Sequence, residues 1–185
     1  WLLASASGAG LDERLRAETA AIAEVYRLAT TPEWQAIAAL LAGANRVFVA
    51  GFQSERGLAM GFSSQLGYVR PGVRLIDTAA GTFAEVTSEA QDNDVVVLID
   101  VRRYSQHLRK LAEHATARGV PVVIVTDPYC PWARDVAPHV LTAEVRVERG
   151  RGSLQQSVYE ELTGQADRFA EQIKAAEIQQ KLADQ

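Results

Sequence analysis

Residues 94–100 read Asp-Val-Val-Val-Leu-Ile-Asp, a run of five apolar side chains between two aspartates. A short, nearly continuous apolar run rich in β-branched residues is typical of a strand buried on both faces of a parallel sheet. Similar runs occur at 47–50, 73–76, 120–125 and 139–141. The segments between them have the length of about ten residues or more that a right-handed helical crossover needs. We therefore predict an α/β fold, a three-layer αβα sandwich with a five-stranded parallel sheet.

Helical patterns flank this alternating core. Apolar side chains recur at helical spacing across residues 11–29. Thr31-Pro32 then combines an N-cap residue with proline at the first helical position, and the helix that follows is expected to end near Gly43. A last helix is predicted over 153–183, where a capping-box pattern opens it. The fold class thus includes extra N-terminal and C-terminal helices.

Composition excludes several kinds of site. The net charge of −4 argues against broad contact of this chain with a phosphate backbone. Cys130 is the only cysteine, so no internal disulfide can form, and three scattered histidines give no metal-ligand spacing. No apolar run approaches the roughly 20 residues that span a bilayer. We expect no metal, no cofactor, no membrane contact and a cytoplasmic protein.

Four stretches share their order and spacing with a known family. They are Val-Phe-Val-Ala-Gly-Phe-Gln-Ser at 47–54, the run at 94–104, Ala-Arg-Gly-Val-Pro-Val-Val-Ile-Val-Thr-Asp at 117–127, and Ser-Leu-Gln-Gln-Ser-Val-Tyr at 153–159. Together they resemble the SIS (sugar isomerase) domain of RpiR/MurR-type bacterial transcriptional regulators, over about residues 34–170. Residues 1–33 resemble the helical linker that precedes this domain in the family. The resemblance implies an SIS effector-binding domain over 34–185, with the family's N-terminal helix-turn-helix domain absent from this chain.

The resemblance also implies a function. It suggests an effector-sensing and dimerisation domain that binds a sugar phosphate or a related acidic metabolite. The effector would control DNA binding by the missing helix-turn-helix domain, so we expect DNA contact only through that domain. The long, apolar-rich helices at 11–29 and 153–183 favour a homodimer or higher homo-oligomer, with these helices in or beside the interface.

The expected ligand site lies where the first and third strands end. Ligands of open parallel sheets bind outside the carboxyl ends of the strands, where the crossover direction switches. Backbone N–H groups at a helix start and nearby hydroxyls form a cradle for anions. Ser54 is the leading contact, the alternative being that it only caps the next helix, and Gly51 is expected to permit a tight turn. The predicted ligand-binding residues are Gly51, Gln53, Ser54, Glu55, Asp100, Arg102, Arg103 and Tyr104.

The turn after the third strand departs from the family pattern. SIS proteins carry a phosphate-binding turn rich in Ser or Thr there, whereas this chain has Asp100, Arg102 and Arg103. A carboxylate repels a phosphate unless cations intervene, and the two arginines could supply them. The alternative is an Asp100–Arg103 ion pair that only shapes the loop. A polar anion or a polyol is therefore favoured over a phosphate, and Thr126-Asp127 is expected to shape its own loop.

Catalysis would require a base that removes a proton next to a carbonyl group. The candidates are Glu55, Glu85, His107 and Glu160, of which Glu55 lies beside the expected cradle. No second acid–base partner can be placed, so we expect no catalytic residue and a protein that is not an enzyme. Two alternatives stay open: a phosphosugar (aldose–ketose) isomerase, and a dimerisation module whose pocket is vestigial.

Overall fold

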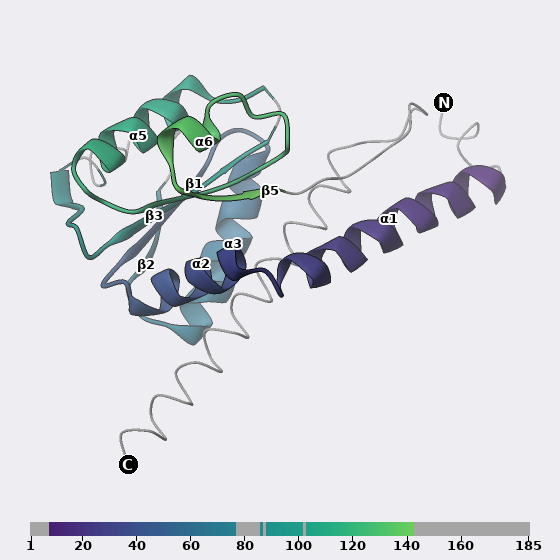
Figure 1. Ribbon diagram of the computed structural model, residues 1–185, viewed down its shortest axis with the longest axis horizontal. Helices are drawn as coiled ribbons and strands as arrows, with labels where there is room; N and C mark the ends of the chain where they lie inside the picture. The colour runs from purple at the N-terminus through teal and green to yellow at the C-terminus, as the bar shows by residue number, and fades with distance from the viewer. Residues whose placement is uncertain (1–7, 77–85, 87, 102, 143–185) are drawn as a thin grey trace, which may run out of the picture.

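The protein forms one five-stranded sheet between two layers of helices (Figure 1). The computed structural model describes residues 8–76, 86, 88–101 and 103–142. Its helices are α1 (Gly8–Leu28), α2 (Pro32–Gly43), α3 (Glu55–Val69), α5 (Gln106–Ala117) and α6 (Ala133–Val136). Its strands are β1 (Val47–Gly51), β2 (Val73–Ile76), β3 (Val95–Asp100), β4 (Val122–Thr126) and β5 (His139–Thr142). The predicted three-layer α/β sandwich is confirmed.

All neighbouring strands run parallel, in the order β2-β1-β3-β4-β5. The three central strands β1, β3 and β4 are buried along their whole length, as their continuous apolar runs predict. The edge strands β2 and β5 keep partly exposed positions. The chain passes from β1 outward to β2 and then returns to the other side of β1 to form β3. The crossover direction therefore switches between β1 and β3, and the carboxyl ends of these strands are where ligands of open parallel sheets bind.

Alternate residues of each strand enter two separate cores. Val47 and Val49 pack with Trp34 of α2 and Phe62 of α3 on one face of the sheet. Phe48 and its even-numbered neighbours pack on the other face, against α5 and α6. This follows from the two-residue period of a strand, whose successive side chains point to opposite faces. Figure 1 shows the same division, with α2 and α3 on one side and α5 and α6 on the other.

The first two helices follow the sequence pattern. The Thr31 Oγ1 accepts the N–H of Trp34 at 3.3 Å, so Thr31 caps α2 ahead of Pro32 as predicted. Helix α1 projects from the sandwich (Figure 1). Among the described residues, no helix has the length and apolar character that a membrane crossing requires. The helix predicted at 153–183 lies outside the described residues.

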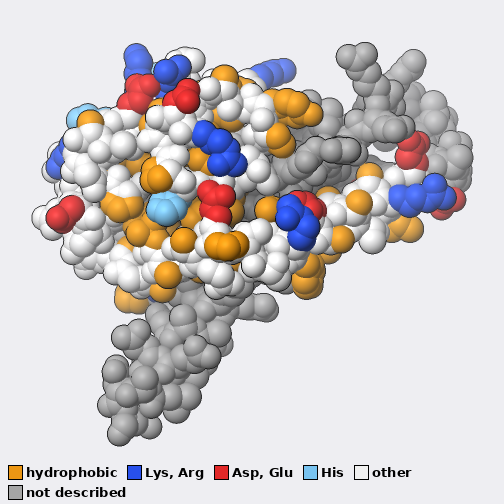
Figure 2. Space-filling model, viewed as in Figure 1, with side chains coloured by type: hydrophobic (Ala, Val, Ile, Leu, Met, Phe, Trp, Pro, Cys, Tyr) orange, Lys and Arg blue, Asp and Glu red, His pale blue; other side chains and the backbone are white. Residues whose placement is uncertain are grey.

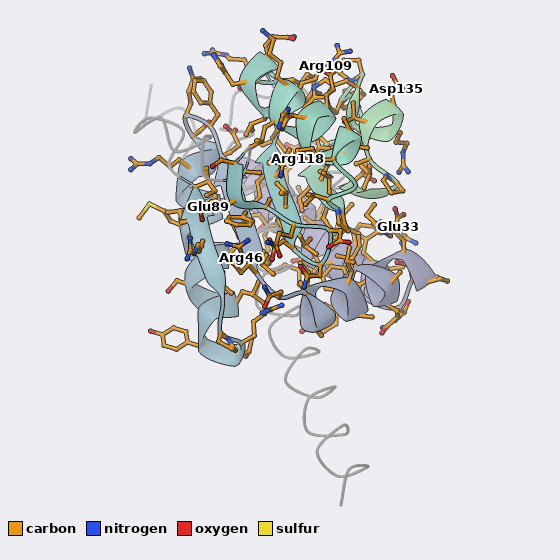
Figure 3. All side chains as sticks on the ribbon, turned by 90° about the vertical axis from the view of Figure 1, so that its left-hand side faces the viewer. Glu33, Arg46, Glu89, Arg109, Arg118 and Asp135 are labelled. Atoms are coloured by element: carbon orange, nitrogen blue, oxygen red, sulfur yellow. The ribbon has the colours of Figure 1, made fainter. Side chains whose placement is uncertain are left out.

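The amino end of the sheet is held by paired charges. The Asp94 carboxylate, 0% exposed, lies 2.7 Å from the Arg46 guanidinium and also accepts the N–H groups of Arg46 and Gln91. Glu89 lies 3.6 Å from Arg46, and Figure 3 shows these two side chains together. Nearby, the buried Arg70 guanidinium donates to the carbonyls of Leu41, at the end of α2, and of Ala44, just beyond it. The polar groups at this end therefore satisfy one another.

Candidate functional site

The candidate site lies at the opposite edge, where β1, β3 and β4 end. The loop after β1 leads into α3, the loop after β3 leads into α5, and Asp127 follows β4 directly. Since the strands are adjacent and parallel, their three end loops meet at one edge. Seven of the eight predicted ligand-binding residues are described there, and Arg102 lies outside the described residues.

Gly51 allows helix α3 to begin close against β1. A Cβ atom at this position would lie 2.3 Å from the Glu55 carbonyl oxygen and 3.1 Å from the Ala59 Cβ. Distances of this kind require the backbone to shift. The sequence predicted a tight turn here, but the physical requirement is room for the first turn of α3. Gly51 therefore sets how near the Ser54 and Glu55 side chains come to the sheet edge.

One non-glycine residue in each of two site loops adopts the left-handed conformation. Gln53 after β1 has φ +53°, and Arg103 after β3 has φ +52°. In the described ranges these are the non-glycine residues with positive φ, a conformation that is uncommon for L-residues. Such strain persists where the surrounding structure enforces it, and it concentrates at ligand sites. It is therefore a functional signal at both predicted loops.

Ser54 and Glu55 form a hydrogen-bonded pair at the start of α3. Ser54 occupies the N-cap position, but its backbone is helical and its side chain makes no capping bond. Its hydroxyl donates instead to the Glu55 Oε1 at 2.9 Å. Burial raises the pKa of Glu55, although the hydrogen bonds from its own backbone N–H and from Ser54 act in the other direction. The structure thus places Ser54 beside a buried acid and does not give its side chain the capping role that was the alternative.

Asp100 is a nearly inaccessible carboxyl group at the end of β3. It is 2% exposed, and its Oδ2 accepts the backbone N–H of Ser105 at 2.9 Å. Burial raises its pKa to about 7, and the charges of Glu55 and Asp127 act in the same direction, against the bond from Ser105. Arg103 is exposed, and between described residues no ion pair joins it to Asp100. The Asp100–Arg103 pair considered from the sequence is not formed there.

One hydrogen bond joins the loops after β3 and β4, and another joins the last residues of these two strands. The Tyr104 hydroxyl donates to the Asp127 Oδ1 at 2.5 Å, and Asp127 also accepts the Tyr129 N–H at 2.8 Å. The Thr126 Oγ1 donates to the Asp100 carbonyl oxygen at 2.5 Å. Thr126-Asp127 therefore shapes this loop, as the sequence predicted. Sequence reasoning did not place Asp127 or Ser105 in the site, although Asp127 ends its strand as Asp100 does.

An aromatic contact joins the loop after β1 to helix α5. The rings of Phe52 and His107 lie 5.8 Å apart between centroids, with a tilt of 34°. The sequence named His107 as one of the candidate bases, and its side chain is exposed. Its contact with Phe52 nevertheless brings it to the rim of the same site. Only tertiary proximity reveals this, because the two residues belong to different elements.

A comparison with protein families identifies the domain. The model of the SIS domain matches residues 40–157, which is more than half of the chain. The chain belongs to the SIS domain family. The match begins in α2 and includes all five strands. No curated protein matches this chain.

Solved structures show that regulators and enzymes both share this SIS fold. The sugar isomerase domain of an RpiR transcription factor from Sphaerobacter thermophilus is 23% identical, with a TM-score of 0.71 and 90% of each chain covered. The NanR protein of Vibrio vulnificus, complexed with ManNAc-6P, is 14% identical at a TM-score of 0.69, covering 93% of this chain and 63% of that one. A phosphoheptose isomerase from Francisella tularensis is 15% identical at 0.74, covering 91% and 98%. At these identities the similarity establishes the fold alone.

The chemistry of the SIS site is set by its acids. Glu55, Asp100 and Asp127 lie at the carboxyl ends of β1, β3 and β4, and the charges of Glu55 and Asp127 contribute to raising the pKa of Asp100. Within the described ranges, no group of three or more His, Cys, Asp or Glu side chains has the arrangement of a metal site. Carboxylates in this setting accept hydrogen bonds from hydroxyl or ammonium groups of a ligand. Glu55, whose pKa is also raised by burial, lies beside the Ser54 hydroxyl at the start of α3, and it is the candidate for proton transfer.

Proposed function

We propose that this SIS domain is the effector-sensing and dimerisation part of a cytoplasmic RpiR-type transcriptional regulator. The domain would comprise residues 34–185, and residues 1–33 would link it to a DNA-binding helix-turn-helix domain. The effector would be a sugar phosphate or a related acidic metabolite, held at the carboxyl ends of β1 and β3. The complex of NanR with ManNAc-6P supports a small-molecule ligand for a domain of this fold.

The observation that carries the regulatory proposal is the bonding of the acids. Asp100 is held by the Ser105 N–H, and Asp127 is held by the Tyr104 hydroxyl and the Tyr129 N–H. Groups fixed in this way shape a binding surface. Aldose–ketose isomerisation needs groups that reach the substrate and exchange protons with it. The pKa of Asp100 is raised to about 7, but this carboxyl group is only 2% exposed. A site in which two of three acids serve the loops favours ligand binding over turnover.

A phosphosugar isomerase is the second candidate, because one observation favours it. Glu55 is buried, its pKa is raised, and it lies beside the Ser54 hydroxyl at the sheet edge. A carboxylate with these properties could remove a proton next to a carbonyl group. Glu55 is therefore the residue whose substitution separates the two functions.

One titration series tests these functions. The protein is titrated with a panel of sugar phosphates, binding is measured by calorimetry, and aldose–ketose conversion is followed by proton NMR. Saturable binding without conversion supports the regulator, and conversion that Glu55→Gln abolishes supports the isomerase. Arg103→Ala should weaken binding roughly tenfold to hundredfold, since a charge-assisted contact contributes about 1.5–3 kcal/mol. If the protein neither binds nor converts any of these compounds, a dimerisation module is the function that remains.

Helix α1 supports the dimerisation role. Leu15, Ile22 and Tyr26 are 63%, 55% and 56% exposed, and their spacing of seven and four residues places them on one helical face. Figure 2 shows hydrophobic side chains along this projecting helix. Light scattering at tens of micromolar should give a dimer mass for the wild type and a monomer mass for Ile22→Glu. A wild-type monomer would contradict the proposed assembly.

A further inference from the structure

The N-terminus of α5 is already occupied by oxygen atoms of the chain itself. Ser105 is the N-cap residue, and its Oγ accepts the Leu108 N–H at 3.4 Å. The Ser105 N–H points to the Asp100 Oδ2 at 2.9 Å. Asp100 and Ser105 are both buried, at 2% and 6% exposure. Two donors that would otherwise be free at the start of the helix therefore have internal acceptors.

This arrangement matters because of where α5 begins. The first turn of a helix attracts anions, since its N–H groups and its dipole favour negative charge. In an open parallel sheet, a helix start beside the switch point is also where ligands bind. In this SIS domain α5 begins beside the carboxyl end of β3, directly at that point. Asp100 thus contributes a carboxylate where a bound anion would be expected.

The surroundings add to the effect. Glu55 at the start of α3 and Asp127 after β4 place two further carboxyl groups near Asp100, and their charges contribute to raising its pKa. A phosphate group entering here would meet like charges in a partly buried setting, where Coulomb repulsion is much stronger than in water. A sugar hydroxyl would meet acceptors instead.

We infer that Asp100 is a specificity-determining residue, which excludes a phosphate group from the N-terminus of α5 and reserves this position for hydroxyl groups. The inference rests on the proposed effector site. The buried Asp100 carboxylate acts through its charge, so that the polyol part of the effector faces the start of α5. Any acid group of the effector lies away from α5, on the side of the exposed Arg103.

The test compares Asp100→Asn with the wild type at pH 8, using inorganic phosphate, glucose 6-phosphate and glucose as probes in calorimetry. Asparagine keeps the shape and an oxygen for the Ser105 N–H, and it removes the charge. Phosphate and glucose 6-phosphate should bind roughly tenfold or more tightly to Asp100→Asn, because a like charge at short range is gone. Glucose should not gain affinity. Asp100→Ser, which also removes the carboxylate, should show the same gain.

Asp135→Asn is the matched control, because Asp135 is an exposed residue of α6 (Figure 3). It removes the same charge away from the site and should leave phosphate affinity within twofold of the wild type. Tight phosphate binding by the wild type that Asp100→Asn weakens or leaves unchanged would overturn the inference, while the proposed effector role would stand. Conversely, a wild type that binds no sugar phosphate or sugar would count against the proposed function. A gain of phosphate binding in Asp100→Asn would still support the exclusion.

Discussion

The two ends of strand β3 place the same residue type in opposite states. Asp94, just before the strand, and Asp100, at its end, are 0% and 2% exposed, so burial opposes the charge of both. At Asp94, burial acts to raise the pKa, but the hydrogen bonds and the charge of Arg46, together with the Gln91 N–H, outweigh it and lower the pKa. At Asp100, burial dominates, the nearby carboxyl groups add to it, and the pKa rises to about 7. The amino end has a cation for its buried acid, whereas between described residues no ion pair joins a cation to Asp100.

This difference separates stability from function along one strand. A buried charge that is paired and hydrogen-bonded holds its surroundings in place. A buried acid whose pKa is raised by burial and by neighbouring charges costs stability when it is ionised, and such groups cluster at functional sites. The loss of stability at the carboxyl end of the sheet is therefore best explained by a function at that end.

The largest effect should come from breaking the paired end. Asp94→Ala leaves the Arg46 guanidinium and two backbone N–H groups without their acceptor. We expect a loss of about 3 kcal/mol in the free energy of unfolding, at the lower end for buried pairs. The lower end applies because the Arg46 side chain keeps 20% of its surface exposed. Urea unfolding at pH 7 measures this, and a loss below about 1 kcal/mol would show that the pair contributes little.

A smaller loss is expected from crowding the functional end. Gly51→Ala forces a methyl group against the Glu55 carbonyl oxygen, and overpacking of this kind costs about 1–3 kcal/mol. Gly61→Ala is the matched control, because a Cβ there meets nothing within 4 Å in the middle of α3. That change should stabilise the protein by up to about 1 kcal/mol through helix propensity. Equal effects of the two substitutions in thermal unfolding would contradict the close approach.

Neutralising the unpaired acid should act in the direction opposite to Asp94→Ala. Because the folded-state pKa of Asp100 is raised from 3.8 to about 7, its favourable contribution is complete below the unfolded pKa and is lost as pH rises through 7. Asp100→Asn removes this dependence. A shift of this size corresponds to at most about 4 kcal/mol. Relaxation and water penetration around a buried charge reduce this amount, so the variant should gain about 1–2 kcal/mol relative to the wild type between pH 4 and pH 8.

Urea unfolding of the wild type and of Asp100→Asn at several pH values measures that gain. Asp94 has the opposite linkage: its lowered pKa contributes stability above the unfolded value, which is lost as pH falls through the folded one. If the free energies of unfolding of the wild type and Asp100→Asn differ by the same amount at every pH, the proposed electrostatic difference between the two ends of β3 is wrong.

The smallest effect is expected at Ser54. Its side chain makes no capping bond and is exposed, so Ser54→Ala should change the free energy of unfolding by less than about 0.5 kcal/mol. Thr31→Ala, at the start of α2, removes a capping bond and should cost about 1 kcal/mol. The pair is compared by thermal unfolding. A larger loss at Ser54 than at Thr31 would reinstate Ser54 as a helix cap.

Local patterns predicted the fold well and the site only in part. Apolar runs placed all five strands and Thr31-Pro32 placed the start of α2, because burial and capping act within a few residues. The same patterns could not show that Tyr104 meets Asp127, or that Phe52 meets His107, since these contacts join different elements. They also could not show that Gly51 is needed for the approach of a helix. Periodicity reports which face of an element is apolar, but it does not report which loops become neighbours.

The hydrogen bonds between the loops after β3 and β4 have a further consequence for ligand binding. The Tyr104–Asp127 bond joins the two loops, and the Thr126–Asp100 bond joins the strand ends from which they start, before any ligand binds. The conformational entropy of the two loops is therefore lost during folding, and it is not lost again when a ligand binds. When the loops are ordered in advance, more of the energy of the ligand contacts contributes to affinity. Small, polar ligands gain most from it, because they make too few contacts to order a loose loop by themselves.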